Sequence, residues 1–115
     1  MSKKQDLETI LARVEAGNAF KGVGFGGTVY SAYSGSLDSA IELKDAVLVG
    51  MSQYSIVTDP TCIKVSVCWW PDGISRERQY YAEAWCEENE ARALLICIIK
   101  NLIAECENEA ANGNT

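Results

Sequence analysis

The strongest constraint on the fold is an apolar run near the C-terminal end, from Ala91 to Leu102. Residues 94–99 are all apolar, and Lys100 is the first polar break. Acidic residues at positions 87, 88 and 90 suit the positive end of a helix dipole, so we predict a helix from about Asn89 to Glu107. A helix that is apolar on every side is buried on more than one face. It must therefore pack on a sheet and also on another helix or another subunit.

Two further helices are predicted upstream. Apolar residues with helical spacing (Leu7, Ile10, Leu11 and Val14) form one stripe, and Gly17-Asn18 ends that helix. Ser36 is a suitable N-cap for a second, short helix, and Asp38 is well placed against its dipole. The buried face of the short helix is expected to consist of Leu37, Ala40 and Ile41.

The middle of the chain predicts strands. Alternation of apolar and polar residues over Ile63–Trp69 indicates a half-buried strand, and Trp70–Gly73 has the Pro and Gly of a turn. Further strands are expected around Tyr54–Thr58 and Arg78–Trp85. We therefore predict one domain, residues 1–115, of the α+β class: a three-stranded antiparallel meander packed between helices in the order α-α-β-β-β-α.

Composition narrows the function. A net charge of −6 and a pI near 4.6 argue against binding of nucleic acid, which needs clustered Lys and Arg. Five cysteines without a Cys-x-x-Cys pair, and no histidine, argue against a metal site and against a Cys–His nucleophile. We expect no cofactor, signal peptide or membrane span, and a reducing, cytoplasmic location in a bacterial host.

A glycine-rich segment, Lys21–Thr28, fits the pattern G-x-G-x-x-G but follows a predicted helix instead of a strand. A flexible connector is one interpretation. The other is a phosphate-binding nest built from backbone N–H groups, with Lys21 and Gly24 as ligand-binding residues.

An aromatic and arginine group is the second candidate site. Alternation places Trp69 and Trp70 on opposite sheet faces, and Arg76, Arg78 and Tyr81 are expected across the hairpin. Aromatic rings with arginines suit a base and a phosphate, so Trp70, Arg76, Arg78 and Tyr81 are predicted to bind a ligand. The alternative is a two-sided core with surface arginines.

Acidic residues at positions 83, 87, 88 and 90 are better explained as a solvated helix start than as an acid/base pair. The chain is therefore expected not to be an enzyme.

The segments Tyr33–Leu43 and Ala46–Gly50, together with Leu7–Ala16 and Ala91–Leu102, resemble the phage ABA-sandwich family of small phage and prophage proteins. The chain departs from that family at Gly50-Met51, where no Gly-Trp follows Val49. The resemblance implies a phage origin and an α-β-α arrangement, and it supplies no catalytic residues.

Three hypotheses follow. The first is a non-enzymatic, homo-oligomeric counter-defence protein that sequesters a host nucleotide signal. The second is an acidic inhibitor that docks on a host defence protein such as a CRISPR effector. The third is a phage accessory protein with no role in defence.

Overall fold

The structure, a computed structural model, describes residues 3–16, 37–58, 60–73, 78–87 and 89–112. Its elements, in chain order, are α1 (Lys3–Ala16), α3 (Leu37–Val47), β1 (Met51–Thr58), β2 (Ile63–Trp70), β3 (Tyr80–Cys86) and α4 (Glu90–Asn112). The strands form one antiparallel sheet in the order β1-β2-β3. The predicted α+β class, element order and meander are confirmed.

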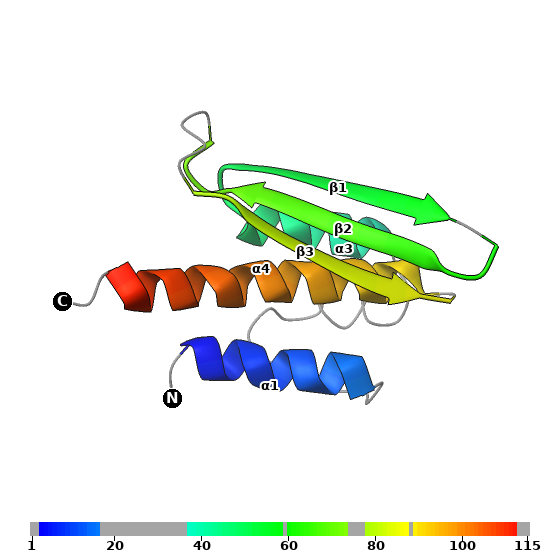
Figure 1. The fold of residues 1–115 in the computed structure, drawn as a ribbon, viewed down its shortest axis with the longest axis horizontal. Coiled ribbons are helices and arrows are strands. Elements are labelled where there is room, and N and C mark those ends of the chain that lie inside the picture. Colours follow the sequence, from blue (N-terminus) through cyan, green and yellow to red (C-terminus); the bar gives the residue numbers. More distant parts are fainter. Residues whose placement is uncertain (1–2, 17–36, 59, 74–77, 88, 113–115) are drawn as a thin grey trace.

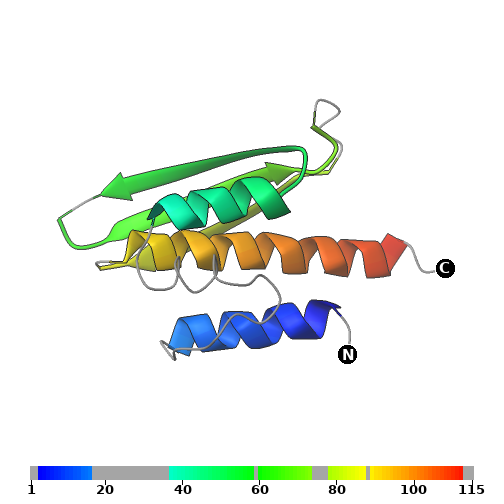
Figure 2. The ribbon, with the colours of Figure 1, turned by 180° about the vertical axis from the view of Figure 1, so that it is seen from behind.

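The layers run from the sheet, through α3 and α4, to α1 (Figures 1 and 2). Helix α4 contacts β2 and β3 on one side and α1 and α3 on its others, so it occupies the centre of the molecule. The apolar residues on the several sides of α4 thus find packing partners within a single chain. The helices of the described ranges all lie on one side of the sheet (Figures 1 and 2). Helix α1 packs on α4, so α4, and not the sheet, is the element that lies between two layers.

The inner face of the sheet forms the core with α4. Val65, Val67 and Trp69 of β2 are buried there, as are Ala82 and Ala84 of β3. The alternate residues of these strands point to the outer face, where Lys64 and Glu83 form an ion pair of 3.0 Å. Alternation predicted this division, since a strand presents successive side chains to opposite faces.

Two polar side chains of α4 reach the central strand. The Sγ of Cys97 donates to the carbonyl of Val65 at 3.4 Å, and Nδ2 of Asn101 donates to the carbonyl of Val67 at 3.3 Å. Both side chains are buried. These contacts fix the position of α4 along β2.

Gly50 joins α3 to the sheet. Its φ is 105°, and a Cβ built there would lie 2.6 Å from the carbonyl oxygen of Trp70 and 2.5 Å from that of Pro71. Only glycine fits such a close backbone approach at this φ. The start of β1 is therefore fixed against the turn that follows β2.

Element boundaries differ modestly from the predictions. Strand β1 begins three residues before the predicted Tyr54, and α4 continues to Asn112 instead of ending at Glu107. The amide N–H of Arg92 donates to Oδ1 of Asn89 at 2.9 Å, which makes Asn89 the N-cap of α4. The predicted cap Ser36 and stop Gly17-Asn18 lie outside the described residues.

Candidate binding groove at the β3 edge

Three of the six predicted ligand-binding residues, Lys21, Gly24 and Arg76, lie outside the described residues. The other three are Trp70, Arg78 and Tyr81, and the sheet does not bring them together.

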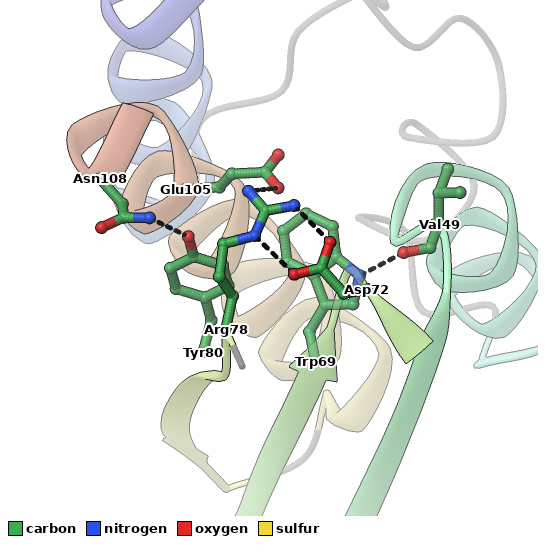
Figure 3. A network of polar contacts seen from close by, with 7 residues as sticks. All are labelled: Val49, Trp69, Asp72, Arg78, Tyr80, Glu105 and Asn108. Atoms are coloured by element: carbon green, nitrogen blue, oxygen red, sulfur yellow. Dashed lines mark hydrogen bonds and ion pairs between the residues drawn. The ribbon is translucent and has the colours of Figure 1, made fainter. Parts of the chain in front are cut away.

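Arg78 turns toward the helix side of the sheet (Figure 3). Its guanidinium donates two hydrogen bonds of 3.0 Å to the carboxylate of Asp72 and forms an ion pair of 3.6 Å with Glu105 of α4. The hydrogen bonds with Asp72 raise the pKa of Arg78, and those with Arg78 lower the pKa of Asp72 below its ordinary value. The guanidinium of Arg78 is thus already paired with two carboxylates. Through these contacts Arg78 links the β2–β3 turn to α4.

The same end of the sheet contains a second polar link to α4. Nδ2 of Asn108 donates to the hydroxyl of Tyr80 at 3.0 Å, and the ring of Tyr80 packs on Trp69 with 5.5 Å between centroids. Nε1 of Trp69 donates to the carbonyl of Val49 at 2.8 Å (Figure 3). Trp69 is therefore a core residue whose indole nitrogen has a hydrogen-bond partner. We interpret this network as stabilising the fold and not as a ligand site.

Trp70 and Tyr81 lie on the outer face, away from Arg78. Trp70 is half-buried, whereas Tyr81 is 53% exposed and donates a hydrogen bond to Glu83 at 3.0 Å. Hydrogen bonds from Lys64 and then Tyr81 lower the pKa of Glu83. In the described residues, the outer face thus carries aromatic side chains and the Lys64–Glu83 ion pair.

A groove lies beside β3, where the edge of the sheet meets α4 and the end of α1. Its volume is about 590 Å³, within the ~300–1,000 Å³ that is typical of ligand sites. Trp85 stands at its side with 59% of its surface exposed. The groove is lined by Val14, Glu15, Trp85, Cys86, Glu87, Asn89, Arg92, Ala93 and Ile96.

A second hollow of about 360 Å³ adjoins the groove and shares Glu15, Trp85 and Ile96 with it. Lys100 also lines this hollow. Arg92, Ile96 and Lys100 are spaced four residues apart, so they lie on one face of α4. Ile96 is half-buried, unlike its apolar neighbours in α4, because its face of the helix borders the groove.

The groove combines an apolar wall with charged margins. Val14, Trp85 and Ile96 supply the apolar surface. Glu15 and Glu87 are exposed and form no ion pair with any residue in the described ranges. Such a surface suits an apolar side chain flanked by basic groups.

Sequence reasoning placed Trp85 at the end of a predicted strand but did not find the groove. The signal was present in β3, because Trp85 alternates with Ala82 and Ala84 and shares the parity of Glu83. Val14 and Glu15 belong to α1, and only the packing of α1 on α4 brings them near β3. No local pattern could have linked them to Trp85.

The cysteines are free thiols. Burial raises the pKa of Cys97 to about 12, and burial, then Glu90 and Cys62, raise the pKa of Cys86. In the described part of the chain, no group of three His, Cys, Asp or Glu could hold a metal ion, and no helix is long and apolar enough to cross a membrane.

The chain matches no protein-family model, and it has no significant match among curated proteins or solved structures. The resemblance to the phage ABA-sandwich family therefore remains a prediction from the sequence.

Proposed function

We propose that the protein is a non-catalytic binding protein whose groove beside β3 holds an apolar segment of a partner protein. The observation that carries this proposal is the exposure of Trp85, 59%, beside a groove that also presents Val14 and Ile96. Exposed aromatic side chains are frequent energetic centres of protein interfaces. The phage resemblance supports a host protein as partner and counter-defence as the role.

A protein partner fits the charges better than a nucleotide does. Glu15 and Glu87 line the groove and are exposed, whereas Arg92, its basic residue, is half-buried. Arg78 is already bound by the carboxylates of Asp72 and Glu105. Carboxylates repel a phosphate and attract lysine or arginine. We therefore expect the partner segment to carry a basic residue beside its apolar anchor.

Two single substitutions test this proposal. Trp85→Ala and Tyr81→Ala each remove an exposed ring from β3, of 59% and 53% exposure, but only Trp85 lines the groove. Host-lysate proteins retained by immobilised wild type should also be retained by Tyr81→Ala and be lost with Trp85→Ala. Synthetic peptides from those proteins should bind more weakly as salt rises. Equal retention by both variants would refute the groove as the binding site.

A nucleotide is the second candidate ligand, because Trp85 and Arg92 line one groove. An indole can stack on a base, and a guanidinium can pair with a phosphate. A nucleotide at ~100 times its Kd would stabilise the fold by about 2.7 kcal/mol. A thermal-shift screen of mono-, di- and cyclic nucleotides should then show a selective rise in Tm that Trp85→Ala abolishes. A flat screen would eliminate this candidate.

A further inference from the structure

Strand β1 is an edge strand without the usual protection. It pairs with β2 at all eight of its positions, Met51 to Thr58, in an unbroken register. On its other side no strand of the described ranges pairs with it. The strand contains no charged residue, proline or glycine. Proteins normally block such an edge with charge, proline or a bulge, because its free N–H and C=O groups pair readily with another strand.

The side chains of β1 are also open to a partner. Residues 53–55, 57 and 58 are exposed, and Tyr54 and Val57 expose 41% and 54% of their surfaces. The other edge differs, because β3 has Glu83 at its centre. The sheet thus has one edge with a charge and one edge without.

We propose that β1 pairs antiparallel with β1 of a second copy of this chain, which joins the two sheets into one of six strands. A two-fold axis through Ser55 places Tyr54 opposite Ile56 of the second copy, and Gln53 opposite Val57. An axis through Tyr54 places Ser52 opposite Ile56 instead. In both registers the same face of the sheet stays on the same side, and β1 contributes no charged residue of its own to the pairing.

A second copy is the occupant that these features favour. An uncharged strand carries no electrostatic information to select a different partner. A two-fold pairing also satisfies both free edges at once and closes the assembly at two chains. The grooves beside Trp85 then lie at the two outer edges of the joined sheet, so the dimer would present two binding sites.

The first test is the mass of the full chain in solution. Sedimentation equilibrium from micromolar to near-millimolar concentration should give twice 12.6 kDa, about 25 kDa, for the wild type. Hydrogen exchange should show β1 amides whose protection rises with protein concentration. A wild type that stays monomeric over this range would overturn the proposal.

Substitutions then locate the interface. Ser55→Lys places two ammonium groups opposite or diagonally adjacent at the two-fold axis and should raise the dimer Kd about tenfold or more. Ala12→Lys adds the same charge to the exposed face of α1 and should leave the Kd unchanged. Circular dichroism checks that both variants fold. A dimer that Ser55→Lys does not weaken would place the interface elsewhere and overturn the proposal.

The groove and the dimer can fail separately. Trp85→Ala, at the opposite edge of the sheet, should leave the Kd of the dimer unchanged. Ser55→Lys should still bind the partner segment as a monomer. Each measurement therefore reports on one proposal.

Discussion

Replacing Asn101 by leucine should stabilise the protein, although it removes a hydrogen bond. Asn101 is 1% exposed in α4, and its Nδ2 donates to the carbonyl of Val67 at 3.3 Å. Its Oδ1 is buried and has no hydrogen-bond partner within the described part of the chain. The side chain thus contributes one long hydrogen bond and buries one unsatisfied oxygen.

The sign of the change in stability depends on the free energies of the hydrogen bond and of the unsatisfied oxygen. A hydrogen bond contributes about 0.5–1.5 kcal/mol net, and a distance of 3.3 Å puts this one at the weak end. A buried acceptor without a partner costs about 1–3 kcal/mol. Leucine removes both the weak hydrogen bond and the unsatisfied oxygen, and it adds apolar contact with the core. We therefore expect the free energy of unfolding to rise by about 0.5–2 kcal/mol, and Tm by about 2–8 °C.

Urea unfolding followed by circular dichroism measures this change. An unaltered m-value, the dependence of the unfolding free energy on urea concentration, would show that the variant differs from the wild type in stability alone. Asn101→Ala is the matched control, because it removes the same polar atoms but leaves a void. It should be about 2–5 kcal/mol less stable than the leucine variant. A leucine variant that unfolds at lower urea than the wild type would refute the reasoning.

Three further outcomes are expected. Trp69→Ala should lower the free energy of unfolding by about 3–5 kcal/mol in urea titrations, because it leaves a cavity in the core and removes the donor to the Val49 carbonyl. A decrease of less than about 1 kcal/mol would contradict the burial of the ring. Arg78 lowers the pKa of Asp72, so this carboxylate stabilises the fold above its unfolded pKa, and the effect is lost as pH falls through its folded pKa. Asp72→Asn should therefore show a shallower fall of Tm with acidification than the wild type, and equal slopes would exclude the contribution. Cys97, with a pKa raised to about 12 by burial, should resist iodoacetamide at pH 8 until the protein is unfolded, as read by mass spectrometry, whereas native labelling at that residue would show an accessible thiol.

Local patterns were sufficient for most of the fold. The stripe of Leu7, Ile10 and Val14 marks α1, and the alternation from Ile63 marks β2, because side-chain periodicity follows directly from backbone geometry. The ends of the helices and strands were harder to predict from the sequence. Strand β1 begins at Met51 because the close approach at Gly50 positions it, and that contact involves Trp70 and Pro71, which are distant in sequence.

The candidate site was predictable only in part. Composition pointed to the aromatic residues of β3, but the ion pair with Glu105 holds Arg78 on the helix side, whereas strand parity places Tyr81 on the outer face. Lys44 shows the same limit. It is buried in α3, where its ammonium contacts Asp45 at 2.7 Å and Ser52 at 3.0 Å, and nothing in the local pattern distinguishes it from an exposed lysine.

By itself, the sequence determined the secondary structure and the need to bury α4 on several sides, because periodicity and apolar content are local properties of the chain. The tertiary structure decided which surfaces cover α4 and which remain open. Packing α1 on α4, instead of on the sheet, leaves the outer face exposed and forms the groove between Val14, Trp85 and Ile96. That choice depends on how residues distant in sequence fit together, which no single segment encodes.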